Sequence, residues 1–139
     1  GALGKKLISV KDIMLSGKKI PLINENRKMK DALVLMSKKS LGCIVATSSN
    51  NYVSGFISDG DLRRKSKNNL MQKKVKDVMT KKPIFISENL LAAKALHIMN
   101  KKKITNLIVA SEKDCNKKNK NFKAKGIVHI HTLLSKGIQ

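Results

Sequence analysis

The stretch GFISDGDLRR, residues 55–64, gathers the side chains best suited to hold a ligand. A chain with thirty basic and nine acidic residues places two of its acids here, Asp59 and Asp61. Ser58 and Asp61 are three positions apart where a strand is expected to give way to a helix, which is the spacing of a capping box. The Asp61 carboxylate could equally accept two hydrogen bonds from neighbouring hydroxyls of a sugar. The spacing alone leaves both interpretations open.

Arg63 and Arg64 follow within one turn of the expected helix. Their charge suits a phosphate or a carboxylate, and the free backbone N–H groups at a helix start favour the same kind of ligand. A solvated helix face is the alternative for both arginines. Catalysis is poorly supported, because Asp59 and Asp61 diverge on a helix and the sequence lacks a glycine-rich phosphate loop and a Ser-His-Asp arrangement. We therefore expect this chain to bind a ligand and to carry out no chemistry of its own.

These residues belong to an internal duplication. VKDIM at 10–14 returns as VKDVM at 75–79, and GFISDGDL, which begins at Gly55, returns as GIVHIHTL, which begins at Gly126. Apolar residues spaced by three and four predict a helix in each copy, and short apolar runs predict the strands. The expected helices include Met29–Met36 and Ala92–Met99 and begin again near Asp59 and His131; the expected strands are Ile20–Ile23, Cys43–Thr47, Tyr52–Ser58, Ile84–Ser87, Asn106–Ser111 and Ala124–Ile130.

Each copy is therefore expected to run strand, helix, strand, strand, helix. A unit this small buries too little apolar surface to be stable alone. We predict an α/β (α+β) fold in which two β-α-β-β-α repeats pack around a pseudo-twofold axis, with ligand clefts where they meet. The expected parts are a linker at 1–9, a first repeat at 10–67 and a second repeat at 75–139, with a flexible Lys/Asn-rich loop at 112–123.

The second copy departs from the first at the positions that could bind a ligand. His129 stands where Ser58 stands in the first copy, and Thr132 stands where Asp61 does. Because threonine offers one uncharged hydroxyl, we expect a weaker grip on a sugar diol there. His129 and His131 alternate without a third ligand, which is weak support for a metal site, and we predict none. His131 could instead contact an acidic group of a ligand.

The composition limits the possible partners. The chain has 139 residues, a formal net charge of +21, 41% hydrophobic residues and 3% aromatic residues. Lysines are spread along the chain and stacking aromatics are scarce, so we favour a solvated lysine surface over a nucleic-acid face. Cys43 and Cys115 have no CxxC spacing, and no apolar run approaches the roughly 18 residues that a membrane span needs. A basic nucleic-acid-binding module stays as the alternative from another class of function.

The repeat resembles the tandem cystathionine-β-synthase (CBS) domain pair, also called the Bateman module. The stretches that carry this resemblance are VKDIM, VKDVM, DALVLM, AKALHIM and GFISDGDL. GALGKKL, IPLI, LGCIVAT, GFISDGDLRR, ITNLIVA and HIHTLLSKGI further resemble the C-terminal half of arabinose-5-phosphate isomerases. That family interconverts ribulose 5-phosphate and arabinose 5-phosphate for the lipopolysaccharide and capsule pathways. The resemblance implies a parent chain in which a sugar-isomerase domain, the carrier of the chemistry, precedes Gly1.

The resemblance also implies a regulatory ligand and the residues that hold it. In the family pattern Gly-hydrophobic-hydrophobic-Ser/Thr-x-x-Asp, the Asp takes both ribose hydroxyls and the Ser or Thr helps to hold phosphate or sugar. The ligand would be a nucleotide or a sugar nucleotide, such as AMP or CMP-Kdo, in the cleft between the repeats, and no further cofactor is expected. The candidate ligand-binding residues are Ser58, Asp61, Arg63, Arg64, Ile20, Leu22, Gly42, Thr105, His129 and His131.

The same resemblance implies a setting for the protein. We expect a homodimer of domain pairs in the cytoplasm, attached to a sugar-isomerase domain, with no membrane or nucleic-acid partner. The runner-up within the same fold is a free-standing adenylate sensor that regulates another protein.

Overall fold

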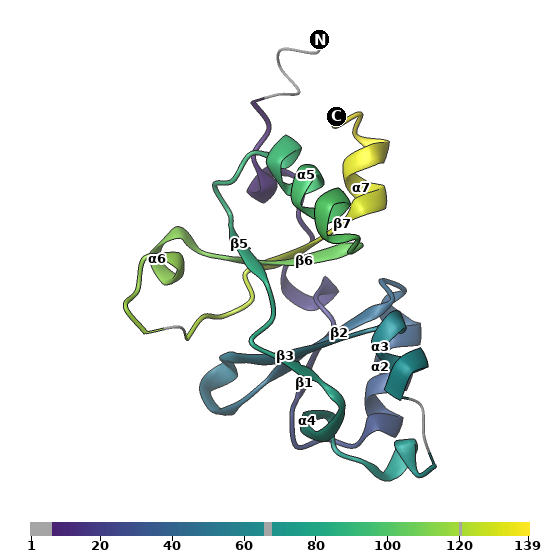
Figure 1. Cartoon of the computed structure of the whole chain (residues 1–139). Helices are drawn as coiled ribbons and strands as arrows, with labels where there is room; N and C mark the ends of the chain where they lie inside the picture. Colours follow the sequence, from purple (N-terminus) through teal and green to yellow (C-terminus); the bar gives the residue numbers. More distant parts are fainter. Residues whose placement is uncertain (1–6, 66–67, 120) are drawn as a thin grey trace. The chain divides into compact units, whose positions relative to one another are not determined.

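The computed structural model describes most of the chain, namely residues 7–65, 68–119 and 121–139 (Figure 1). Residues 1–6, which open the expected linker, lie outside the described residues. So do residues 66–67, at the end of the expected first repeat, and residue 120 in the expected loop.

Two compact units make up the described chain. Residues 18–83 form one unit, and residues 84–139 form the other together with residues 7–17. Each unit contains the predicted order strand, helix, strand, strand, helix, so the predicted fold class is confirmed. Within the described ranges, none of the helices has the length and apolar character that a membrane crossing requires.

A four-stranded sheet flanked by helices forms the 18–83 unit. Its elements are β1 (Leu22–Asn24), α2 (Met29–Lys39), β2 (Cys43–Thr47), β3 (Val53–Ser58), α3 (Asp59–Lys65), α4 (Val75–Val78) and β4 (Thr80–Lys81), with short 3-10 helices at Gly17–Lys19, Ser49–Asn51 and Leu70–Gln72. The strands lie in the order β1-β2-β3-β4. β1 runs parallel to β2, whereas β3 is antiparallel to both of its neighbours.

The core of this unit depends on one face of α2. Met29, Ala32 and Met36 recur every three to four residues, so they share a face of the helix. All three are buried and pack in one cluster with Ile44 of β2. The helix ends where Ser40 takes a left-handed backbone conformation with φ of 58°. The methionines are therefore core residues, as their spacing predicted.

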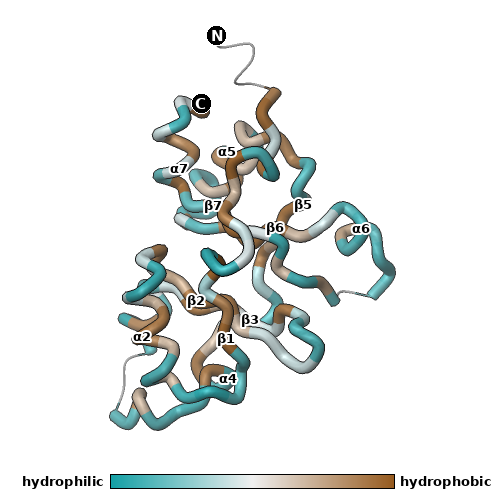
Figure 2. Tube along the Cα trace, turned by 180° about the vertical axis from the view of Figure 1, so that it is seen from behind, coloured by the Kyte–Doolittle hydropathy of each residue, from teal (hydrophilic) through white to brown (hydrophobic). Residues whose placement is uncertain are grey.

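A three-stranded sheet and its helices form the 84–139 unit. Its elements are a 3-10 helix (Val10–Asp12), β5 (Phe85–Ser87), α5 (Ala92–Lys102), β6 (Asn106–Ala110), α6 (Glu112–Cys115), β7 (Gly126–His129) and α7 (Ile130–Ser135). β6 lies between β5, to which it is parallel, and β7, to which it is antiparallel. All five residues are buried in β2 and likewise in β6, the central strand of this sheet, and both strands run through largely brown, apolar stretches in Figure 2.

The first VKD-Met motif, VKDIM at 10–14, packs in the 84–139 unit. The backbone N–H of Val10 donates to the carbonyl of Leu90 at 2.8 Å. Met14 lies so close to Gly126 of β7 that a methyl group on that glycine would come within 2.3 Å of the Met14 sulfur. A side chain at position 126 would therefore displace the methionine.

The second motif, VKDVM at 75–79, packs in the 18–83 unit. The backbone N–H of Val75 donates to the carbonyl of Arg27 at 2.8 Å, and Met79 lies against Gly55 of β3 in the same way. Each motif thus packs on the sheet of the other sequence repeat. For this reason the compact units divide the chain at other places than the repeats do.

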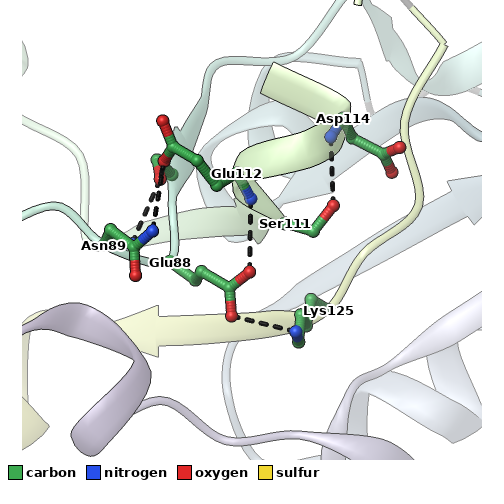
Figure 3. Close-up of polar contacts among 7 residues, drawn as sticks. Glu88, Asn89, Ser111, Glu112, Asp114 and Lys125 are labelled. Carbon is green, nitrogen blue, oxygen red and sulfur yellow. Dashed lines mark hydrogen bonds and ion pairs between the residues drawn. The ribbon is translucent and has the colours of Figure 1, made fainter. Parts of the chain in front are cut away.

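The segment between β6 and β7 is tied to the residues that follow β5 (Figure 3). Glu88 accepts a hydrogen bond from the backbone N–H of Glu112 through Oε2, at 3.2 Å, and pairs with Lys125 through Oε1, at 2.9 Å. Asp114 donates its backbone N–H to the hydroxyl of Ser111 at 3.1 Å, which caps α6. One glutamate therefore connects the start of α6 to the residue just before β7.

An aromatic contact adds a second connection. Phe122 is buried, and its ring stacks on that of Phe85 with the centroids 3.9 Å apart. The composition of 112–123 predicts a flexible loop and gives no sign of α6 or of these contacts. Their partners, Glu88 and Phe85, lie more than twenty residues away in the sequence.

Candidate functional site

The junction of β3 and α3 brings Ser58 and Asp61 into direct contact. The backbone N–H of Asp61 donates to the Ser58 hydroxyl at 3.1 Å, and the backbone N–H of Ser58 donates to Oδ2 of Asp61 at 3.0 Å. These reciprocal bonds form the capping box that the three-residue spacing predicted.

The Asp61 carboxylate is almost buried and is held ionised. Only 8% of the residue is exposed, and its Oδ1 lies 2.8 Å from Nη2 of Arg64. Burial by itself raises the pKa of this carboxyl. The hydrogen bonds from the Ser58 backbone, the Arg64 guanidinium and the Ser58 hydroxyl outweigh burial, so the pKa lies below its usual value. An ionised hydrogen-bond acceptor, the Asp61 carboxylate, therefore lies in the first turn of α3, just after β3 ends.

The capping box leaves hydrogen-bonding capacity at the junction. A carboxylate offers about four acceptor positions, and the contacts to the Ser58 backbone N–H and to Arg64 use one on each oxygen. The Ser58 hydroxyl accepts from the backbone N–H of Asp61, and its proton, which helps to lower the pKa of the Asp61 carboxyl, can turn from that carboxylate to a ligand oxygen. The structural and the ligand-binding interpretations of this motif are thus compatible, because the cap uses only part of the capacity of each group.

Gly42 lies beside the same junction. It takes a left-handed backbone conformation with φ of 69°, and its carbonyl accepts from the backbone N–H of Asp59 at 3.1 Å. A methyl group on Gly42 would lie 2.8 Å from Oδ2 of Asp59. This contact of Asp59 was missed from the sequence, because it depends on the register that pairs Cys43 with Ser58.

Cys43 is not a reactive thiol in this setting. Burial, with the nearby Asp59 charge, raises the pKa of Cys43 to about 12, so the thiolate is disfavoured. Cys43 is instead a small buried residue of the core.

The remaining predicted residues of this unit are less closely connected to Asp61. Ile20 is buried, whereas Leu22 of β1 is 40% exposed and pairs with Val45 of β2. In the sheet, β2 lies between β1 and β3, the strand that leads into the Ser58–Asp61 junction. Leu22 is therefore one strand away from β3, and Ile20 lies two residues before β1. Arg63 is exposed on α3 and makes no ion pair with any residue that the structure describes.

The junction of β7 and α7 in the 84–139 unit holds the other predicted residues. His129 accepts the backbone N–H of His131 through Nδ1 at 3.0 Å, and the two rings lie with centroids 4.7 Å apart. The backbone N–H of Ile130 donates to the carbonyl of Thr105 at 2.8 Å, which repeats the bond between Asp59 and Gly42. Burial and the neighbouring His131 lower the pKa of His129. The β7–α7 junction therefore repeats this backbone hydrogen bond of the β3–α3 junction, but it has Thr132 in place of the carboxylate of Asp61.

The structure thus sorts the predicted residues into two sets. Seven lie in the 18–83 unit and three, Thr105, His129 and His131, lie in the 84–139 unit. Among the side chains that the structure describes, no three His, Cys, Asp or Glu residues are grouped so that they could hold a metal ion.

Comparison with known proteins gives two kinds of match. The model of the CBS domain matches residues 10–68 and 75–138. Arabinose 5-phosphate isomerase KdsD of Yersinia pestis is 36% identical over 141 residues, which cover 99% of this chain and 40% of that protein. The chain therefore spans about 40% of the length of the curated relatives that it matches.

Solved structures share the fold at low sequence identity. CBSX2 in complex with AMP is 20% identical with a TM-score of 0.75, over 94% of this chain and 96% of that one. The CBS domain pair of MJ0100, in complex with 5-methylthioadenosine and S-adenosyl-L-methionine, is 18% identical with a TM-score of 0.76, over 94% and 96%. Since the family model covers both repeats and each repeat contributes a β-α-β-β-α unit, the chain belongs to the CBS domain family and carries two copies of the domain.

Proposed function

We propose that this chain is a regulatory module that binds a ribonucleotide at the β3–α3 junction and has no catalytic role. The observation that carries the proposal is the Asp61 carboxylate, which is 8% exposed and ionised and has two acceptor positions left once the Ser58 proton turns to the ligand. Two acceptors on one charged group suit the two hydroxyls of a ribose. The Ser58 hydroxyl would turn its proton from the Asp61 carboxylate to a phosphate oxygen.

The proposal places the stronger binding site in the 18–83 unit. Thr132 stands at the position of Asp61 in the other junction and carries no charge. His129 already accepts the backbone N–H of His131 there. His131 and the carbonyl of Thr105 would serve a ligand only as secondary contacts.

Similarity to KdsD supports a more specific role. We propose that the module is the regulatory part of an arabinose 5-phosphate isomerase, works as a homodimer and responds to CMP-Kdo, an activated product of the pathway that such an enzyme would open. CMP-Kdo offers a ribose to Asp61, a phosphate to Ser58 and a carboxylate to Arg63 or Arg64. KdsD matches only through 40% of its length, so the isomerase context depends on this resemblance.

An adenylate sensor is the second candidate. The specific support is that CBSX2 was solved in complex with AMP, and MJ0100 in complex with two adenosine-containing ligands. In this version Asp61 and Ser58 keep their roles, and the acidic sugar is not required.

A ligand panel separates the two candidates. Isothermal titration calorimetry of the 139-residue chain with CMP-Kdo, CMP, AMP and ATP, at one ionic strength, should show tightest binding of CMP-Kdo. Tighter binding of AMP than of CMP-Kdo would refute the feedback role and support the adenylate sensor. Equal binding of CMP and CMP-Kdo would show that the acidic sugar is not recognised. Failure of all four ligands to bind would refute the proposed nucleotide site.

A further inference from the structure

Arg64 forms an ion pair with the Asp61 carboxylate, which is proposed to bind the ribose of the ligand. Its Nη2 lies 2.8 Å from Oδ1 of Asp61, and its side chain is 70% exposed whereas that of Asp61 is 12% exposed. A methyl group on Gly60 would lie 3.2 Å from Nη1 of Arg64 and 3.6 Å from the hydroxyl oxygen of Ser58. The guanidinium therefore lies over the first turn of α3, close to both groups that are proposed to hold the ligand.

Two properties make this contact exchangeable. An ion pair with a largely exposed arginine contributes little to stability, so the guanidinium can leave Asp61 easily. Arginine also has five N–H donors in a planar fork, and one of them is used in the bond to Asp61. A phosphate placed beside the Ser58 hydroxyl would meet the unused donors. An uncharged nucleoside would have to share Oδ1 with the guanidinium or displace it, and would offer the guanidinium no anion in return.

We propose that Arg64 makes the Asp61 site selective for anionic ribose ligands by exchanging its contact with Asp61 for one with the phosphate of the ligand. On this proposal the guanidinium shields Oδ1 in the ligand-free protein, and an incoming phosphate draws it away, which frees that oxygen for a ribose hydroxyl. Arg64 is thus a specificity-determining residue. This inference rests on the proposed function, because it requires that Asp61 binds the ribose.

Arg63 provides a matched control. It is the neighbouring residue of α3, carries the same charge and is exposed. Residues two apart on a helix do not face each other, whereas residues three apart do, so Arg64 reaches Asp61 and Arg63 does not. Removing either arginine lowers the large positive charge of the chain by the same amount.

The test compares a nucleotide with its nucleoside. Calorimetric titrations of AMP and adenosine, and of CMP and cytidine, would use the 139-residue chain and its Arg64→Gln and Arg63→Gln variants at one ionic strength. We expect Arg64→Gln to weaken binding of the nucleotide by about tenfold or more, because a charge-assisted hydrogen bond is lost, and to leave the nucleoside unchanged or bound more tightly. Arg63→Gln should change the affinity for these four compounds by less than about threefold, because none of them carries the carboxylate proposed for Arg63 and an exposed charge acts only through a screened field.

The outcomes separate this inference from the proposed function. An equal loss of nucleotide and nucleoside binding in Arg64→Gln, with circular dichroism unchanged, would overturn the inference and leave the ribose site standing. An equal effect of Arg63→Gln on the nucleotides would also overturn it, because general charge would then explain the preference. Absence of binding by all four compounds to the unmodified chain would refute the inference and the proposed function together.

Discussion

Replacing Gly55 with alanine should destabilise the 18–83 unit through Met79. A methyl group at position 55 would lie 2.3 Å from the sulfur of Met79, 2.5 Å from its Cγ and 2.9 Å from its Cβ. The last contact matters most, because a Cβ atom cannot move away by a change of side-chain rotamer alone. Either β3 or the segment that carries Met79 must therefore shift.

The expected size of the effect comes from two opposing terms. In a strand without such a clash, Gly→Ala stabilises by roughly 0.5–1 kcal/mol, since glycine loses more backbone entropy on folding. Overpacking of a well-packed contact costs about 1–3 kcal/mol. The overpacking term is larger, so we expect Gly55→Ala to lower the free energy of unfolding by about 1–2 kcal/mol.

A double-mutant cycle in chemical denaturation tests the cause. Met79→Gly removes all three clashing atoms, so the combined variant should be more stable than the sum of the single changes predicts, by about 1 kcal/mol or more. Gly55→Ala combined with Met14→Gly is the control, because Met14 packs on Gly126 in the other unit and the two effects should add. Additive effects for Gly55 and Met79, or a stabilising Gly55→Ala, would refute the packing of this motif on β3.

The 139-residue chain alone should not convert arabinose 5-phosphate above background in a coupled assay, because the proposal assigns that chemistry to a separate sugar-isomerase domain; measurable turnover would contradict it. Binding to DNA in a salt titration should be weak and should fall steeply as salt rises, since dispersed lysines act through counterion release; tight, sequence-selective binding at physiological salt would contradict the account. Burial and His131 lower the pKa of His129, so the stabilising contribution of this residue is present above the pKa of an unfolded histidine, about 6.5, and is lost as the pH falls through the lower folded-state pKa. The free energy of unfolding should therefore decrease more for the unmodified chain than for His129→Gln between about pH 8 and 5; identical pH profiles for the two proteins would refute the pKa argument.

Local patterns in the sequence predicted much of the fold. β2 has the bounds Cys43–Thr47 that its apolar run indicated, and the apolar faces of α2 and α5 are buried as their spacing required. At the candidate site, the capping box of Ser58 and Asp61 followed from a spacing of three residues. These features are predictable because each is decided within one element or one helical turn.

Features that depend on distant segments were not predicted. β4 is two residues long and exists only because Thr80 and Lys81 pair with β3. The packing of Met79 on Gly55 joins residues whose motifs look like separate repeats. The special position of Arg64 was accessible in principle, because helical geometry favours a partner three residues from Asp61 over one two residues away.

The most direct test of the central claim measures the ligand affinity of Asp61→Asn. Calorimetry would use the tightest ligand of the panel, with Asp59→Asn as a control that removes the same charge from the same helical turn. The account predicts that Asp61→Asn weakens binding by about tenfold to a hundredfold, as expected for the loss of charge-assisted hydrogen bonds worth about 1.5–3 kcal/mol. Asp59→Asn should stay within about threefold of the unmodified chain, because its charge is exposed and screened. Unchanged affinity in a folded Asp61→Asn variant would contradict the claim that this carboxylate holds the ligand.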